Sequence, residues 1–332
     1  MSFSPNQTDN DNSLNKTLTT IAGSLSVLGT IFIFVTFLLY RDLRTSSRKV
    51  LVYISIGDFL TALVNVSGIW ETKSRTFCEA EATINIAAIL SSFFWTVYLS
   101  VFLYLVLCVG IRSETERRVM IVFHLTAWGI PILMAALALG FNAVGHTKDR
   151  TSDGWCWIKT DNIQWRWLLF WMVFAGKGWE ILSYFAISFF YIKVKWFLKH
   201  QVYPSAGNPL LNTQAVVHRA DRKFTFIPIV FILLRIWGTV RFFRYASCLP
   251  DCQLTGPTFD PTWLKILHGI GDSSQGFANF IIFCIFTEKF RTKLRFLFHK
   301  ICPRCVGEPN LVSTYPVGYE STNILTDQSY EK

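Results

Sequence analysis

Long apolar stretches alternate with short charged segments along this chain, and the stretch 78–110 is the clearest of them. No charged residue occurs between Glu81 and Arg112. As a helix with a rise of about 1.5 Å per residue, this run would be roughly 45 Å long, more than the roughly 30 Å of a hydrocarbon core. It predicts a tilted membrane-spanning helix, because lipid offers the backbone no hydrogen-bond partners. Polar side chains inside the run favour neighbours that are helices rather than lipid; they are Asn85, Ser91, Ser92, Thr96 and Ser100.

The same pattern recurs and predicts an all-α membrane protein with a seven-transmembrane helix bundle. The bundle is expected to occupy residues 19–286, after a short extracellular tail at 1–18. Cations interleaved with aromatic residues at 287–301 predict an amphipathic helix on the cytoplasmic membrane surface, and the polar residues 302–332 predict a disordered tail. The seven spans are expected at 19–40, 50–70, 78–110, 119–140, 165–194, 223–246 and 261–286.

Composition supports this class. The 332 residues are 51% hydrophobic and 16% charged, whereas a soluble domain carries about 25% charged residues. The net charge of +10 would suggest nucleic acid in a soluble protein. Here the cations cluster between the apolar stretches, which favours cytoplasmic loops facing anionic membrane lipid, and no nucleic-acid partner is expected.

The distribution of cations sets the expected orientation. Lysines and arginines concentrate in the segments 41–49, 112–118, 193–199, 219–223 and 289–295, which should therefore be cytoplasmic. The N-terminus is then extracellular and the C-terminus cytoplasmic, in a multi-pass protein of the plasma membrane. Two glycosylation acceptors, Asn6 and Asn15, fall on the expected outer side.

The cysteines follow the same division between compartments. Cys78 and Cys156 lie on the expected outer side, where a disulfide persists, and we predict a bridge between them; two free thiols are the alternative. Cys248 and Cys252 could close a second, smaller loop, or stay unpaired. Two further cysteines follow the surface helix, where palmitoylation and ordinary reduced thiols are both plausible; they are Cys302 and Cys305.

Several ionisable residues fall inside the predicted spans, where charge is costly and is a functional hypothesis by default. Lys177 and Glu180 share one helix face, as do His268 and Asp272. Either Glu180 or Asp272 could neutralise Arg235 across the bundle. These residues could form structural ion pairs, or line a water-filled cavity for a ligand or switch. The full set is Asp58, Lys177, Glu180, Arg235, His268 and Asp272.

Three other residues have predicted local roles in the sixth span. Pro228 removes a backbone hydrogen bond near the expected cytoplasmic end, which predicts a hinge or a static kink. Arg241 and Arg244 are expected to reach the outer interface by snorkelling.

These features together resemble the G-protein-coupled receptors, and most of all their secretin, adhesion and cyclic-AMP-receptor-like branches. The carrying motifs are AWGIP at 127–131, GWCW at 154–157, IPI at 227–229 and QGF at 275–277. Cys78 matches the family's cysteine at the head of the third helix, which implies the same bridge to Cys156. The rhodopsin-like motifs are absent: CVGIR follows the third span, and NFIIF stands at 279–283. The segment before the first span is too short for the large ectodomains of those branches.

The resemblance implies a receptor that transduces an extracellular stimulus to heterotrimeric G proteins through rearrangement of the bundle. The sequence shows no metal spacing, phosphate loop or nucleophile–base pattern, so no enzyme activity, cofactor or metal is expected. The alternative is a transporter or channel that uses the intramembrane polar residues as a relay, although no repeat of one half in the other supports it. The cations expected to flank the G protein are Arg112, Arg117, Arg118, Lys195, Lys199, Arg222 and Lys223.

Overall fold

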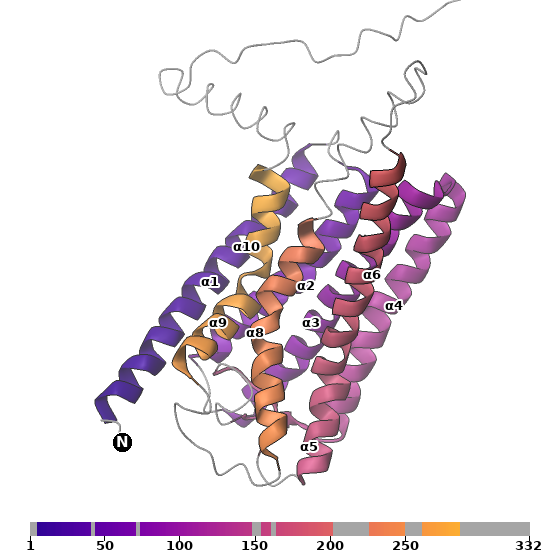
Figure 1. Ribbon diagram of the computed structural model, residues 1–332. Helices are drawn as coiled ribbons and strands as arrows, with labels where there is room; N and C mark the ends of the chain where they lie inside the picture. Colours follow the sequence, from indigo (N-terminus) through magenta and orange to yellow (C-terminus); the bar gives the residue numbers. More distant parts are fainter. Residues whose placement is uncertain are drawn as a thin grey trace, which may run out of the picture. The chain divides into compact units, whose positions relative to one another are not determined.

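The computed structural model describes residues 5–40, 44–70, 74–147, 154–160, 164–201, 226–249 and 261–285. They form a bundle of long helices (Figure 1). The first three are α1 (Pro5–Leu39), α2 (Ser46–Gly68) and α3 (Arg75–Tyr104). After them come η2 (Leu105–Val109), α4 (Ser113–Gly140), α5 (Trp165–Met172), η3 (Val173–Lys177), α6 (Gly178–Gln201), α8 (Phe226–Cys248), α9 (Thr262–Ser273), α10 (Gln275–Phe280) and η5 (Ile281–Ile285).

Four of the described helical segments are long and apolar enough to cross a membrane. They are Ser13–Leu39, Ser46–Gly68, Arg75–Val109 and Ser113–Gly140, which agree with the first four predicted spans. α1 begins at Pro5 rather than near residue 19, because a helix once formed extends readily into adjoining residues. The third, fifth and seventh spans contain π-helical segments, which have wider turns than an α-helix: η2 ends the third, η3 interrupts the fifth and η5 ends the described part of the seventh. Such π segments often occur at functional sites.

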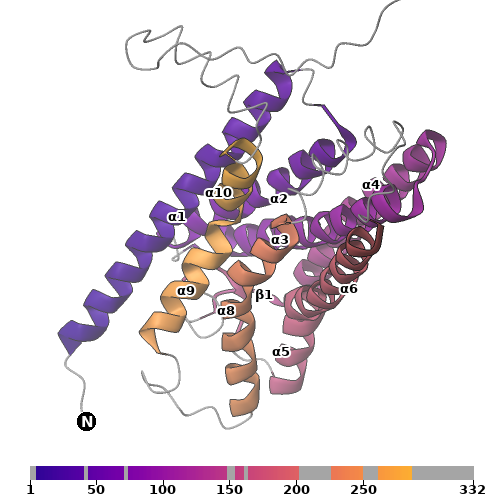
Figure 2. The ribbon, with the colours of Figure 1, turned by 45° about the horizontal axis from the view of Figure 1, so that its top comes forward.

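α3 is the central helix of the bundle. It packs against α2, α4, α6 and α8, and also against the short hairpin formed by β1 (Val144–Gly145) and β2 (Trp157–Ile158). The polar side chains inside α3 that predicted helical neighbours are buried, with Asn85, Ser92 and Thr96 fully so. α9 and α10 lie beside α1, which brings the first and last α-helices of the described part together (Figures 1 and 2).

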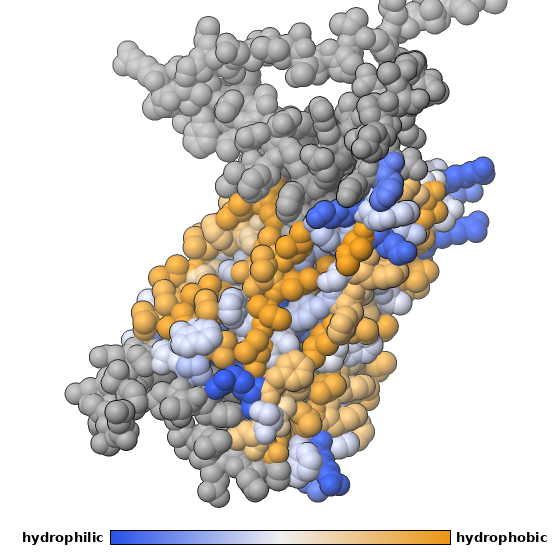
Figure 3. All heavy atoms as spheres, in the orientation of Figure 1, coloured by the Kyte–Doolittle hydropathy of each residue, from blue (hydrophilic) through white to orange (hydrophobic). Residues whose placement is uncertain are grey.

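The face of the bundle shown in Figure 3 is largely apolar along the helices, and its most hydrophilic residues lie toward the two ends. Large side chains such as Leu125, Phe185 and Leu233 are more than half exposed on the helices. Lipid around the bundle would remove these apolar side chains from water. The polar side chains instead face the interior of the bundle.

Candidate functional site

A disulfide fixes the loop between α4 and α5 to the head of α3. Cys78 and Cys156 are bonded, with 5.4 Å between their Cα atoms, which confirms the predicted bridge. The bridge holds Trp155 and Trp157 over the bundle interior; Trp155 is buried and its ring lies 5.5 Å from the ring of His268. Cys248 is also disulfide-bonded. Cys252 lies outside the described residues, so a bridge between those two stays a prediction.

Glu81 is a second anchor of the same loop. Its place at the start of the uncharged run did not predict this role. Its carboxylate is buried and accepts the backbone N–H of Cys156, at 3.3 and 3.4 Å from the two oxygens. A Cβ on Gly68 of α2 would collide with both oxygens of this carboxylate, so an alanine there would displace the end of the Glu81 side chain. Glu81 therefore joins α2, α3 and the loop at one point.

Lys177 and Glu180 form a buried ion pair, as their spacing on one helix face predicted. Lys177 Nζ lies 2.7 Å from Glu180 Oε2. The other oxygen, Oε1, accepts the hydroxyl of Tyr184 at 2.6 Å and that of Thr239 on α8. Both oxygens of Glu180 are thus occupied, and the pair ties α6 to α8.

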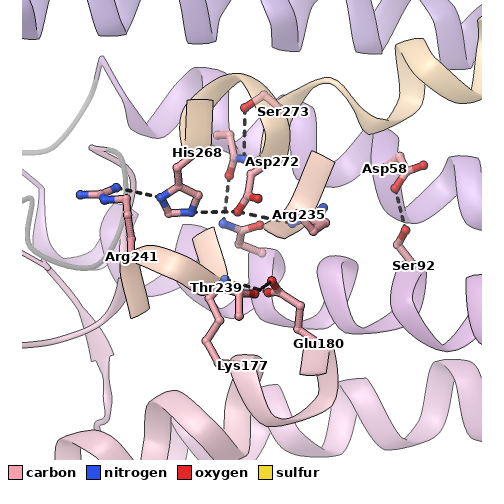
Figure 4. A network of polar contacts seen from close by, with 12 residues as sticks. Asp58, Ser92, Lys177, Glu180, Arg235, Thr239, Arg241, His268, Asp272 and Ser273 are labelled. Atoms are coloured by element: carbon pink, nitrogen blue, oxygen red, sulfur yellow. Dashed lines mark hydrogen bonds and ion pairs between the residues drawn. The ribbon is translucent and has the colours of Figure 1, made fainter. Parts of the chain in front are cut away.

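Arg235 of α8 pairs with Asp272 of α9, which decides between the two partners that the sequence allowed. Arg235 Nη1 lies 3.4 Å from Asp272 Oδ2, and His268 Nε2 lies 3.2 Å from the same oxygen (Figure 4). Arg241 Nη1 contacts His268 Nδ1 at 2.7 Å. Arg241 is therefore buried in the bundle, and the prediction that it snorkels outward was wrong; Arg244 is exposed.

The contact with Arg241 assigns the hydrogen-bond roles of the two His268 nitrogens. A guanidinium can only donate hydrogen bonds, so Nδ1 of His268 is the acceptor from Arg241. Nε2 then faces Asp272 Oδ2 as the donor of the second contact.

Asp58 belongs to a separate cluster that joins α2, α3 and α10. Its Oδ1 accepts the hydroxyl of Ser92 at 2.6 Å, and its Oδ2 accepts the amide of Asn279 at 2.7 Å. The six intramembrane residues therefore divide into three groups: Asp58, the pair Lys177–Glu180, and Arg235 with His268 and Asp272.

A small cavity lies between the two ion pairs and beneath Trp155 and Trp157. About 30 Å³ of it is open to the centre of a water molecule, which is room for about two waters. The polar residues that line it are Asn85, Lys177, Glu180, Arg235, His268 and Asp272, and its apolar lining includes Ile86, Ile89 and Phe93.

Asn85 reaches this cavity at the end of an amide chain that the sequence analysis did not identify. Its Nδ2 donates to Asn65 Oδ1 at 3.0 Å, and Asn65 Nδ2 donates to Ser273 Oγ at 3.4 Å. This series of hydrogen bonds runs from α3 through α2 to α9. Amides inside an apolar stretch were the available signal, although the sequence does not say which of them meet.

Several predicted residues lie at the surface or outside the described part. Asn15 lies within α1 with its side chain 7% exposed, which speaks against a glycan there because a glycan needs a free surface. Pro228 is the third residue of α8 as described, where a missing N–H breaks no bond within the helix, so the hinge stays a prediction. Arg112, Arg117, Arg118 and Lys195 are exposed. The side chains of Asn6 and Lys199 are outside the described part, as are the predicted surface helix and tail with Arg222, Lys223, Cys302 and Cys305.

The protein is a bundle of long apolar helices with buried charges and a loop tied to its third helix. These features are typical of a membrane receptor, and comparison with known proteins agrees. The family model for seven-transmembrane receptors of the secretin family matches residues 12–203. The chain belongs to this family, which consists of multi-pass membrane receptors and not enzymes.

Individual relatives support the same assignment. The chain is 33% identical to G-protein coupled receptor 157 of Mus musculus over 289 residues, which are 85% of this chain and 84% of the relative. It is 32% identical to the Homo sapiens protein of that name over 278 residues, or 82% and 80% of the two chains. Cyclic AMP receptor-like protein A of Dictyostelium discoideum is 24% identical over 284 residues, which are 86% of this chain and 67% of that one.

Proposed function

We propose that this protein is a seven-span receptor that transduces an extracellular stimulus to heterotrimeric G proteins by rearrangement of its helix bundle. The observation that carries the proposal is the buried charged site beneath the disulfide-anchored loop, in a chain that belongs to a receptor family. Placing the N-terminus outside the cell, as the cation bias predicts, puts this loop and the cavity on the extracellular side.

The stimulus side is built from elements that must move together. The disulfide and Glu81 tie the loop to α3, and the two ion pairs tie α6 to α8 and α8 to α9. A ligand that binds one arrangement of these helices better than another shifts their equilibrium. Buried pairs suit such a site because they have few alternative arrangements, so a change in one helix is passed to its partner.

The break between α9 and α10 offers a route from this site toward the opposite end. Ser274 has φ −97° and ψ 2°, outside the regular helix. Asp272, two residues before it, belongs to the cavity, and Asn279, in the helix after it, binds Asp58. A change in the angle at Ser274 would move both contacts, which makes this break a better candidate for a switch than Pro228.

The coupling side is proposed to be the end of the bundle where α4 begins and α6 ends. Hydrophilic residues gather there (Figure 3), and Arg112, Arg117, Arg118 and Lys195 are exposed. α6 contacts η2 just before Arg112, so the two basic segments are neighbours. A positive surface attracts acidic segments of a partner, and it also suits anionic lipid.

Nucleotide exchange tests the proposal. The intact receptor in lipid nanodiscs is mixed with each class of heterotrimeric G protein, and we expect faster exchange on at least one. The double change Arg117→Glu with Arg118→Glu should slow nucleotide exchange severalfold. The control is Arg166→Glu, which replaces an exposed cation in the first turn of α5 and should leave the exchange rate unchanged. Flux of ions or solutes through reconstituted vesicles, with exchange on none of the G proteins, would favour the transporter or channel instead.

A further inference from the structure

The buried site has an unusual set of polar atoms that lack partners. Among the described residues, Nε and Nη2 of Arg235, Oδ1 of Asp272 and Oδ1 of Asn85 are buried and have no hydrogen-bond partner. Arg235 is 1% exposed, Asp272 6% and Asn85 0%. Each such atom costs free energy unless something satisfies it, and all three residues line the same cavity.

The unpartnered donors have the geometry of a carboxylate site. Nε–H and Nη2–H lie parallel on one edge of the guanidinium, a spacing that matches the two oxygens of a carboxylate. The remaining nitrogen, Nη1, is the one that contacts Asp272. The ring of Phe93 lies 5.2 Å from the guanidinium carbon and helps to hold its plane. Arg235 is therefore fixed from two sides, with its bidentate edge unoccupied.

The unpartnered acceptors require a hydrogen-bond donor rather than a carboxylate. Asp272 Oδ2 is already used by Arg235 and His268, which leaves Oδ1 free, and Asn85 uses its amide nitrogen on Asn65. Two oxygen acceptors, one of them charged, suit an ammonium group with its three donors.

Charge balance favours a ligand that carries both groups. The two described ion pairs of the cavity lining, Lys177–Glu180 and Arg235–Asp272, cancel, and Arg241, which contacts His268, is not among the lining residues. A lone carboxylate or a lone ammonium would leave an uncompensated charge in a buried site, which is costly. A carboxylate joined to an ammonium adds no net charge.

We propose that this cavity binds a small zwitterion of the α-amino acid type, with its carboxylate on the Nε–Nη2 edge of Arg235 and its ammonium on Asn85 and Asp272. The inference rests on the proposed function, because it names the chemistry that the receptor's stimulus site recognises. Space for about two waters is less than glycine itself needs, so binding requires the loop that carries Trp155 and Trp157 to shift. A side chain on the ligand would lie against the apolar lining, toward Ile86 and Ile89.

The test uses four two-carbon probes: glycine has both groups, glycolate a hydroxyl in place of the ammonium, acetate only the carboxylate, and ethanolamine no carboxylate. At the ceiling of about 1.5 kcal/mol per non-hydrogen atom, molecules of about five such atoms bind no more tightly than low-micromolar affinity, so each probe is titrated up to about 100 mM. The readout is the Nε–H resonance of Arg235 in the ¹⁵N-arginine-labelled intact receptor, identified by its loss in Arg235→Lys, together with the shift in melting temperature. No G protein is needed.

We expect glycine to shift the resonance and raise the melting temperature most, then glycolate, then acetate, with no effect of ethanolamine. Arg235→Lys keeps the charge and loses the fork, so the melting shift should need at least about tenfold more glycine. Asn85→Leu should reduce the preference for glycine over acetate, and the exposed Arg166→Lys should change nothing.

Three results would overturn the proposal. One is no shift with glycine at about 100 mM, as expected if the cavity holds only its two waters. Another is equal binding of glycine and acetate, and a third is an undiminished melting shift in Arg235→Lys. Binding without any effect on nucleotide exchange would support this inference and count against the proposed coupling, whereas exchange without binding would do the reverse.

Discussion

Two buried ion pairs among the described residues, Lys177–Glu180 and Arg235–Asp272, differ in how completely their atoms are satisfied. Glu180 receives Lys177 on one oxygen, and Tyr184 and Thr239 on the other. Asp272 receives Arg235 and His268 on one oxygen, while its second oxygen and two nitrogens of Arg235 have no partner among the described residues. The first pair is closed and the second is open.

We infer a different role for each pair. A closed pair needs nothing further, and its value lies in fixing α6 against α8, which is a structural role. An open pair is under-satisfied in the protein alone, so a ligand or water completes it. Burial and charge are alike in the two, and only the inventory of hydrogen bonds separates a structural pair from a binding site.

The largest expected effect comes from breaking the closed pair. Glu180→Leu leaves the Lys177 ammonium buried and alone, and should lower the free energy of unfolding by about 3–5 kcal/mol. Lys177→Met together with Glu180→Leu should recover most of this, because no charge is then stranded. Unfolding in mixed micelles measures both. If the double variant is as unstable as the single one, the pair is not what stabilises this region.

A smaller effect should follow from removing one donor of the closed pair. Tyr184→Phe loses the 2.6 Å hydrogen bond to Glu180 and should cost about 1.5–3 kcal/mol, the range for hydrogen bonds to charged groups. Tyr98→Phe is the matched control, since its hydroxyl meets the neutral Thr126 at 2.6 Å and should cost about 1 kcal/mol. Equal losses in the same unfolding assay would remove the distinction.

The smallest effect is expected at Gly238, which lies against both pairs. A Cβ there would come within 2.7 Å of the His268 ring and 2.9 Å of Lys177 Nζ. Gly238→Ala should therefore cost about 1–3 kcal/mol through overpacking. Gly129→Ala, which meets nothing within 4 Å in α4, should be neutral or stabilise by up to about 1 kcal/mol. A stabilised Gly238→Ala would show that the two pairs are loosely packed.

Contacts within one helix were predictable from the sequence because helix geometry is periodic. Lys177 and Glu180, three residues apart, meet as expected, and so do His268 and Asp272, four apart. Contacts between helices were not predictable in the same way. The partner of Arg235 was left open, Arg241 was expected at the interface, and the contacts of Glu81 and Asn85 were not foreseen.

The class of protein could be predicted from the sequence, which has apolar runs long enough for a bilayer, a cation bias between them, and a cysteine at the head of the third run. These are properties of composition and spacing, and lipid imposes them on the chain segment by segment. Which buried charged groups find hydrogen-bond partners could be seen only in the folded bundle. The pairing depends on how each helix is rotated and placed against its neighbours. The π segments, the break at Ser274 and glycines such as Gly238 set that placement, and none of them follows a periodic pattern in the sequence.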